Sequence, residues 1–517
     1  MSQSKRAAKS FFIIIIFTVA CKLLGLVREM LIAAKFGSSA ETDAYFIAIT
    51  ATILFTTIIN ESINTTIIPI LSDVEAAKGE AEKKYQTNNI LNILLLLSLV
   101  ITFLAWVTAP AIVKILATGF NGEQFDLAVS LTRIGLPAIF FSSVLGVFRG
   151  FLQSDLKFTE SAASNLPFNI VYICFLIFFS SIFGIKGMMV TSVVATAAQI
   201  IVLIPGMRKA GYRYRFVLKF KDEYVDKIVK LIPPVLISVA MINLNKIVDR
   251  TMASTLADGS ISALSYASTI DRLTTSLFIA AIVTVIYPIL SKEANKATYD
   301  GLKKVITFGI NIILIITVPA TIGMIILAGP IVKVAYQRGA FDAADAYMTV
   351  GALVFYSVGL VGTALKPMLN RVYYSLQDTK TPMMNGIISV VINIILNLIL
   401  IRFMAVNGLA LATSIAVTVT SLLQLYGLRK KIGPFGLYKS IQCGIKSLAA
   451  AAVMGGIVYF LYDILDKSFS GGTIVQLLTL FVTVGAGGLV YFALIYLFKV
   501  EEMNWFINMV KSKISRK

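Results

Sequence analysis

The sequence contains no histidine, and only three of its 517 residues are cysteines. Histidine is the commonest general base and metal ligand, so a histidine-dependent active site or metal centre is excluded. Cys21, Cys174 and Cys443 lie in apolar stretches, which offers neither a disulfide framework nor a cysteine metal cluster. A P-loop, a dinucleotide-binding fingerprint and a nucleophile elbow are also absent from the sequence. We therefore expect neither an enzyme nor an ATP-driven pump, and no organic cofactor.

Charged residues are scarce as well, at 14% of the chain, whereas soluble domains carry about 25%. Hydrophobic residues make up 57%. The formal net charge of +19 would suggest nucleic-acid binding in a soluble protein. Here the basic residues gather in short connections between apolar segments, as the control of membrane topology requires. The composition therefore predicts a membrane protein that does not bind nucleic acid.

Apolar segments long enough to cross a bilayer recur along the whole chain. They lie at 10–36, 43–71, 88–113, 126–148, 162–184, 187–206, 228–253, 260–290, 305–329, 344–369, 383–403, 407–428, 441–464 and 474–498. The sequence thus predicts an all-α polytopic membrane protein with 14 transmembrane helices. An even number of spans places both termini on one side, and the connections on that side, such as 78–84, are rich in lysine. By the positive-inside rule, we expect both termini to be cytoplasmic.

An internal repeat relates two halves of the chain. IIPILSDVEAAKGEAEKK ends the second span and VIYPILSKEANKATYDGLKK ends the eighth, with Pro69 and Pro288 219 residues apart. Asp155 and Asp378 match at a similar separation, which chance similarity between leucine-rich segments does not explain. Six spans per copy predict two lobes related by a parallel pseudo-twofold axis. The expected organisation is an N-lobe (1–209), a basic amphipathic linker on the inner leaflet (210–227), a C-lobe (228–431), spans 13 and 14 (432–499) and a basic cytoplasmic tail (500–517).

The first span, Phe11–Phe36, carries Lys22, Arg28 and Glu29 well inside its apolar run. Ionisable groups at such depth are costly unless they face protein or water, so they indicate a functional site. Gly25 lies between the two cations and offers a place for the helix to bend, so that both reach one cavity. The alternative is that Lys22 and Arg28 extend to opposite membrane interfaces.

Polar groups also gather in the second half of the chain. Arg272 follows Asp271 near the start of the eighth span, and either a surface ion pair or a cavity position fits this pair. Asn393 and Asn397 share one helix face, where they suit interhelical hydrogen bonding or ion coordination. A cavity lined by arginines favours a phosphate or diphosphate, because the guanidinium fork matches phosphate oxygens and stays charged. The sequence therefore predicts an anionic substrate.

Four segments resemble the signature segments of the MviN/MurJ-type lipid II flippases, in the superfamily that also holds multidrug and polysaccharide exporters. They are LLGLVREMLIAAKFGSSAETDAYFIA, IIPILS, SYASTIDRLTTSLFIAAIVTVIYPILSK and YYSLQDTKTP. The resemblance implies two six-helix lobes around a central cavity and two further helices that form a groove for a polyprenyl tail. It also implies alternating-access movement of undecaprenyl-diphosphate-linked disaccharide-pentapeptide, lipid II, from the inner to the outer leaflet of the bacterial inner membrane.

The resemblance implies residue roles too. Arg28 and Arg272 match cavity arginines that hold the diphosphate, and Glu29 and Asp43 match neighbouring family acids. Lys22 stands where an arginine is usual, which keeps the charge and loses the fork. A further family arginine in the second span is replaced here by Thr57 or Thr56.

A sodium site of some family members is matched by four residues in the second half, with one departure. These residues are Asp249, Asn393, Asn397 and Thr413. Asn397 replaces an acid, so one negative charge that would favour sodium is lost.

Two other transport functions and one non-transport function fit parts of the sequence. A flippase for another undecaprenyl-linked glycan, of O-antigen or capsule type, is supported by the departures at Lys22 and Thr57. A cation-coupled multidrug exporter would need an acidic cavity, which the cationic first span disfavours. A scaffold of cell-envelope assembly leaves the charges inside the membrane unexplained.

Overall fold

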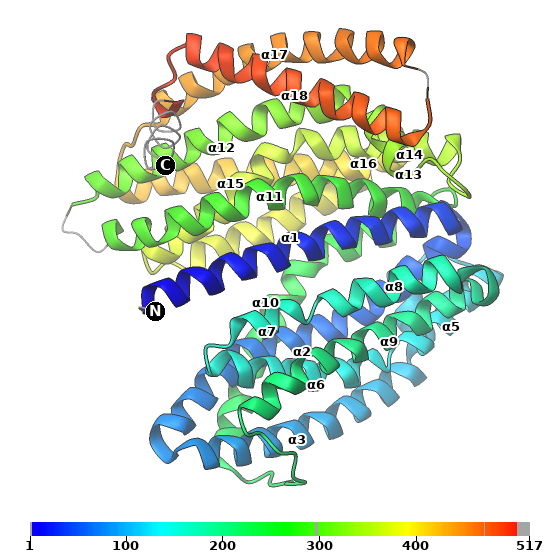
Figure 1. Ribbon diagram of the computed structural model, residues 1–517, viewed down its shortest axis with the longest axis vertical. Helices are drawn as coiled ribbons and strands as arrows, with labels where there is room; N and C mark the ends of the chain where they lie inside the picture. The colour runs from blue at the N-terminus through cyan, green and yellow to red at the C-terminus, as the bar shows by residue number, and fades with distance from the viewer. Residues whose placement is uncertain (1–2, 295–297, 470, 504–517) are drawn as a thin grey trace. The chain divides into compact units, whose positions relative to one another are not determined.

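A computed structural model describes residues 3–294, 298–469 and 471–503, and all the regular secondary structure of these residues is helical (Figure 1). The predicted all-α fold is confirmed. The chain divides into two compact units, Met1–Ser262 with Gly339–Phe341, and Ala263–Arg338 with Asp342–Lys517.

The helices of the first unit are α1 (Gln3–Phe36), α2 (Ala40–Lys78), α3 (Glu80–Val107), α4 (Ala109–Leu116), α5 (Gly122–Gly135), α6 (Ala138–Ser154), α7 (Phe158–Ala163), α8 (Leu166–Phe178), α9 (Ser180–Lys209) and α10 (Glu223–Ala253). Helix α11 (Ser260–Ala294) leads into the second unit. The others there are α12 (Asp300–Ile326), α13 (Ala328–Tyr336), α14 (Ala343–Val358), α15 (Leu360–Ser375), α16 (Lys380–Ile432), α17 (Leu437–Ser468) and α18 (Thr473–Leu497).

Many of these helices are long and apolar enough to cross a membrane. Within the described residues there are nine, or ten if α14 and α15, bent by 46°, form one span. Each of the predicted segments overlaps a helix, and two of them, 383–403 and 407–428, fall in α16. The backbone of α16 breaks between them at Ala405, whose φ is 47°. A multi-pass membrane protein is therefore confirmed, whereas the count of fourteen spans stays a prediction.

The internal repeat reappears in the order of elements. In each copy a long helix, α3 or α12, is followed by a short helix, α4 or α13, that contains the sequence IVK. Two further helices follow, and they end just before Asp155 in the first copy and Asp378 in the second. The boundary between the compact units differs from the boundary between the repeated copies. Helix α10 is the first helix of the second copy, but it packs against α2 and belongs to the first unit.

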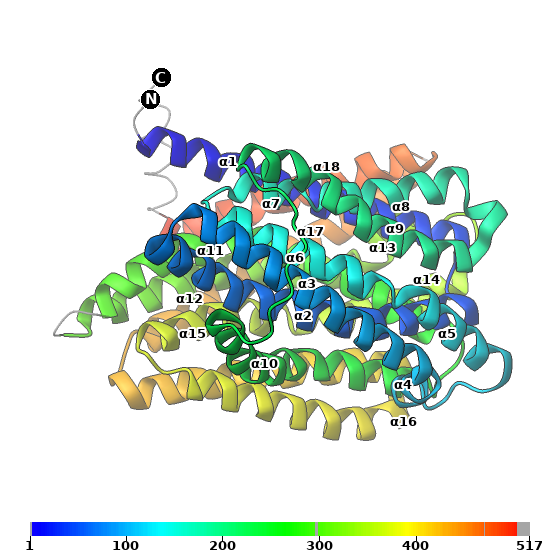
Figure 2. The same cartoon turned by 90° about the horizontal axis from the view of Figure 1, so that it is seen from below.

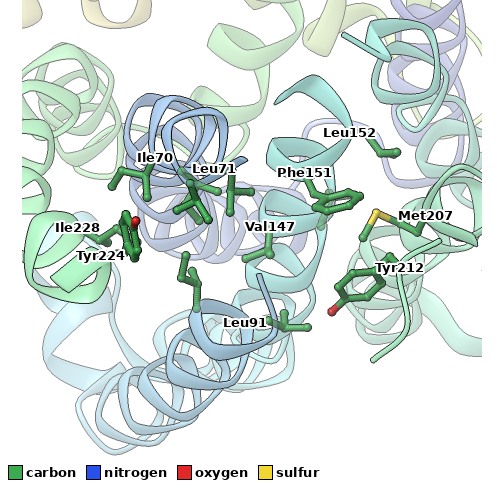
Figure 3. Packing of buried hydrophobic residues seen from close by; sticks show 14 of the residues in the cluster. Ile70, Leu71, Leu91, Val147, Phe151, Leu152, Met207, Tyr212, Tyr224 and Ile228 are labelled. Carbon is green, nitrogen blue, oxygen red and sulfur yellow. The ribbon is translucent and has the colours of Figure 1, made fainter. Parts of the chain in front are cut away.

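A cluster of buried apolar side chains holds the first unit together (Figure 3). It joins α2, α3, α6, α9 and α10 through residues that include Ile70, Leu91, Phe151, Met207 and Ile228. Tyr212, just after α9, packs against Phe151 with ring centroids 5.5 Å apart. These contacts hold α2, α6 and α9 in place, which are three of the helices that form a cavity in this unit.

Lys83 is a buried cation at the end of the first unit where α2 meets α3. Gly79 joins these helices with φ 83°, a left-handed conformation that favours glycine. The Nζ atom of Lys83 lies 2.6 Å from Oε2 of Glu75 and also pairs with Asp155. Burial raises the pKa of Asp155, but hydrogen bonds from Lys83 and Lys157 outweigh it and hold this pKa below its usual value.

In the second unit, Asp378 takes different partners from those of Asp155. Its carboxylate accepts from Nζ of Lys431 at 2.6 Å and from N and Oγ1 of Thr381 at 2.9 and 2.8 Å. Burial acts to raise the pKa of Asp378, but these donors favour the charged form more strongly and lower it to about 2.

The last two helices of the second unit, α17 and α18, pack against each other, and α17 also packs against α12 (Figure 1). Met454, Tyr491 and Ile315 are buried in the cluster between these three helices. The predicted segment 432–499 is therefore a helix pair attached to α12. Most of the predicted basic tail, residues 504–517, lies outside the described residues.

The connection from α9 to α10 runs as an extended segment (Figure 2). Asparagine side chains of α3 hold its backbone: Asn88 accepts from the N–H of Arg215, and Asn89 accepts from the N–H of Lys219. Tyr214 and Phe216 are exposed. Residues 211–222 contain no helix, and the predicted role of 210–227 as an amphipathic linker on the inner leaflet stays a prediction.

Candidate functional site

The charges predicted inside the first span meet on α1. Arg28 donates through Nη2 to Oε1 of Glu29 at 2.7 Å and through Nη1 to Oδ1 of Asn169 at 3.3 Å. Its guanidinium carbon lies 5.5 Å from the ring centroid of Phe168 and 5.3 Å from that of Tyr172. A planar cation suits both contacts, because it donates in its plane and stacks on aromatic faces. Arg28 is therefore fixed toward α8.

This arginine opens onto a cavity of about 530 Å³ inside the first unit. The cavity is formed by α1, α2, α6, α8 and α9. Its polar lining residues are Cys21, Arg28, Glu29, Tyr45, Thr52, Thr56, Asn60, Ser142, Arg149, Asn165, Asn169, Tyr172, Ser192, Thr196 and Gln199. The hydroxyls of Tyr45 and Tyr172 are hydrogen-bonded at 3.1 Å. A polar chamber within a bundle of apolar helices can admit a charged headgroup that the bilayer interior would reject.

Arg149 of α6 is a cavity residue that sequence reasoning missed. Its guanidinium donates to Oγ of Ser164, to Oδ1 of Asn165 at 2.7 Å and to Oε1 of Gln199 at 3.0 Å. The predicted span ended at residue 148, so Arg149 was assigned to a connection, whereas α6 continues to Ser154. The signal was present in the sequence as an arginine directly after an apolar run.

Lys22 and Asp43, predicted to line the cavity, are not among its lining residues. Lys22 is half-buried on α1. Asp43 is 2% exposed and accepts hydrogen bonds from the N–H groups of Gly259 and Ser262. The structure thus gives Asp43 a capping position at the start of α11. Arg28 and Glu29 line this cavity of the first unit, and their binding of substrate stays a prediction.

Arg272 belongs to the second unit, where its side chain is exposed. Its Nη2 atom donates to Oγ1 of Thr269 at 3.3 Å, one turn earlier on α11. The neighbouring Asp271 is half-buried. Binding of an anion by Arg272 stays a prediction.

Three of the four residues of the predicted sodium site lie together on α16. Asn393 donates through Nδ2 to Oγ1 of Thr413 at 3.1 Å, across the break at Ala405, and Asn397 donates to Oδ1 of Asn393 at 3.3 Å. Asp249 is buried on α10 in the first unit. The three α16 side chains supply neutral oxygen atoms, which suit a hard cation, and a sodium site that includes Asp249 stays a prediction.

A family model, described as lipid II flippase MurJ, matches residues 32–480 of this chain. The chain belongs to the MurJ family of lipid II flippases. A relative from Vibrio cholerae, named "Probable lipid II flippase MurJ", is 30% identical over 97% of this chain and 98% of its own length. One from Burkholderia cenocepacia, named "Lipid II flippase MurJ", is 26% identical over 86% of this chain and 88% of its own.

Solved structures agree with this membership of the MurJ family. A structure titled "Lipid II flippase MurJ, inward closed conformation" matches with a TM-score of 0.78 and 27% identity, over 94% of this chain and 98% of the other. A multidrug transporter of the MATE family in the MOP superfamily matches with a TM-score of 0.58 and 15% identity, over 80% of this chain and 94% of the other, which shows a shared fold alone. As a MurJ family member, the protein is a transporter rather than an enzyme.

Thr56 and Thr57 are the two threonines at which the resemblance implies a family arginine. Thr56 lines the cavity, and Thr57 is not among its lining residues. The hydroxyl of Thr56 donates a hydrogen bond to the carbonyl oxygen of Ile53 at 3.3 Å. The cavity face of α2 is therefore uncharged in this MurJ family member, and the cations come from α1 and α6.

Proposed function

We propose that this protein moves lipid II, undecaprenyl-diphosphate-linked disaccharide-pentapeptide, from the inner to the outer leaflet by alternating access of its two repeated lobes. The observation that carries this proposal is the polar cavity of the first unit, with Arg28 held beside Glu29 in a bundle of apolar helices. A guanidinium matches the oxygens of a diphosphate and stays charged at physiological pH.

In this proposal Arg28 and Arg272 bind the diphosphate, and Lys22 adds positive charge to the region. The helix pair α17 and α18 forms the groove for the polyprenyl tail. Its outer side chains, such as Phe460 and Phe481, are exposed and apolar, as a lipid-facing surface requires. Both termini lie in the cytoplasm, because the basic connections share their side of the membrane.

Complementation tests this function. The chain is expressed in a bacterial strain depleted of its own lipid II flippase, and growth and the exposure of lipid II on the outer leaflet are measured. Restored growth and restored exposure are the expected result. Failure of a correctly inserted, full-length protein to restore either one, together with rescue of a strain that lacks an O-antigen or capsule flippase, would assign a different lipid-linked glycan. A fluorescent fusion at the C-terminus, which fluoresces only in the cytoplasm, tests the orientation.

A further inference from the structure

The net charge of the cavity in the first unit comes from Arg149. Three lining residues are of the charged types: Arg28, Glu29 and Arg149. Arg28 and Glu29 form an ion pair at 2.7 Å and offset each other. The partners of Arg149 in the described part of the chain are all neutral, namely Ser164, Asn165 and Gln199. An anion that enters the cavity is therefore attracted mainly by Arg149.

The guanidinium of Arg149 is held in place and still has donors to offer. A guanidinium carries five N–H groups. Within the described residues, Nε donates to Ser164 at 2.9 Å and Nη2 donates to Ser164, Asn165 and Gln199, while Nη1 makes no hydrogen bond. Such a fixed fork with two remaining N–H groups is suited to bind an oxyanion, because little side-chain entropy remains to be lost.

Arg149 and Arg28 contact neighbouring turns of the same helix. Arg149 donates to Asn165, at the start of α8, and Arg28 donates to Asn169. Four residues along a helix correspond to a rise of about 6 Å. Both guanidinium groups thus lie along the wall of the cavity that α8 forms, at two successive positions for an elongated anionic headgroup.

The internal repeat indicates that helix packing does not require this cation. Counted from the matched pair Asp155 and Asp378, the position of Arg149 corresponds to Val372 in the second copy. Val372 is buried in the apolar cluster of the second unit. In the second copy a neutral side chain therefore satisfies the same position, so the charge in the first copy needs another explanation.

We propose that Arg149 is a second anion-binding residue of the cavity. It binds an oxyanion of the lipid-linked substrate, a phosphate or a carboxylate, through Nη1, while Ser164, Asn165 and Gln199 fix its orientation. This inference rests on the proposed function, and it adds a binding position on α6 to the one on α1.

Two variants separate charge from structure. Arg149→Gln removes both the charge and the hydrogen bonds that join α6 to α8. Asn165→Asp keeps Arg149 and strengthens the link between these helices, but it places a carboxylate against the guanidinium and neutralises it. Arg133→Gln on α5 is the matched control, because Arg133 also has neutral contacts, to the carbonyl and ring of Trp106, and does not line the cavity.

The full-length protein in nanodiscs is titrated with undecaprenyl diphosphate and with lipid II, and the thermal unfolding of each variant is recorded. Arg149→Gln and Asn165→Asp are each expected to weaken binding about tenfold or more, the effect of one lost charge-assisted hydrogen bond. Arg133→Gln is expected to bind as the wild type does.

The pattern of loss identifies the oxyanion. Weaker binding of both probes assigns the diphosphate, and weaker binding of lipid II alone assigns a carboxylate of the peptide. Unchanged affinities in Asn165→Asp for both probes would overturn the inference, whatever the stability of Arg149→Gln, because the positive charge would then be irrelevant. If the wild type does not transport lipid II, the proposed function fails instead, and the titration with undecaprenyl diphosphate still tests Arg149.

Discussion

Asp43 and Ser262 lie 219 residues apart, the separation of the repeated Pro69 and Pro288, and they are hydrogen-bonded to each other. Oδ1 of Asp43 accepts from N of Ser262 at 2.8 Å and from its Oγ at 2.6 Å, and Oδ2 accepts from N of Gly259 at 2.8 Å. Positions that the repeat makes equivalent thus meet where α11 begins. The acid predicted for the substrate cavity has a structural role here, since both of its oxygen atoms accept hydrogen bonds.

Asp43→Asn is therefore expected to lower stability. The new amide has only one oxygen, so its NH₂ group must face either the N–H of Gly259 or the donors of Ser262. A lost hydrogen bond to a buried carboxylate costs about 2 to 3 kcal/mol. Thermal unfolding in detergent measures the change, with the exposed Asp258→Asn as the control. Unchanged unfolding combined with lost transport would return Asp43 to a substrate-binding role.

Lys83→Met is expected to destabilise the first unit more strongly. Lys83 is fully buried and neutralises the carboxylates of Glu75 and Asp155, so its loss leaves like charges near each other. Removing one partner of a buried ion pair lowers the free energy of unfolding by about 3 to 5 kcal/mol. The double variant Lys83→Met with Asp155→Asn should recover part of this loss, because one unpaired charge is removed. Additive effects of the two substitutions in thermal unfolding would contradict the pairing.

The Asp378 site predicts a pH dependence. Its pKa in the folded protein, about 2, lies below the ordinary value of 3.8. A lowered pKa means that the carboxylate stabilises the fold fully above pH 3.8, and that this contribution is lost as the pH falls toward 2. The difference in unfolding temperature between the wild type and Asp378→Asn should therefore be constant near neutral pH and shrink below pH 3.8. A constant difference down to the lowest accessible pH would contradict the assignment.

The helical class, the apolar segments and the duplication were predicted from the sequence, because each depends on local composition or on a sequence pattern that is repeated along the chain. The sequence also predicted that Arg28 and Glu29 face a cavity, because a charged side chain deep in an apolar segment is costly unless it faces protein or water. These are properties that a single segment carries by itself.

Other features depend on contacts between segments that are distant in the sequence, so they could not be predicted from a single segment. Asp43 and Ser262 meet through tertiary packing, and nothing near Asp43 in the sequence signals a cap for α11. Arg149 was missed because a window of apolar residues ends before the helix does. The asparagines of α3 that hold the backbone at Arg215 and Lys219 give no periodic signal, so the attachment of this segment to α3 could not be predicted.

Sodium coupling is testable through Asn397. If the oxygen atoms of Asn393, Asn397 and Thr413 bind sodium, transport should slow when sodium is replaced by potassium. Asn397→Asp should then lower the sodium concentration for half-maximal transport about tenfold, because a carboxylate attracts the cation more strongly than an amide. Asn385→Asp is the control. Asn385 precedes Asn397 by twelve residues on α16, and its side chain donates to the carbonyl of Thr381. Equal rates in sodium and potassium would point to the membrane potential as the driving force.

Arg28→Ala is expected to abolish transport, and the reason lies in its partner. Without Arg28, the carboxylate of Glu29 remains in the cavity and repels the diphosphate, so the loss should exceed about tenfold. Arg28→Lys keeps the charge without the fork and should retain part of the activity. Glu29→Gln removes the negative charge and should leave binding of undecaprenyl diphosphate unchanged or tighter. Lipid II exposure in cells and binding in nanodiscs measure these effects. Full activity of Arg28→Ala would remove Arg28 from the binding site, and weaker binding in Glu29→Gln would show that the acid itself contacts the substrate.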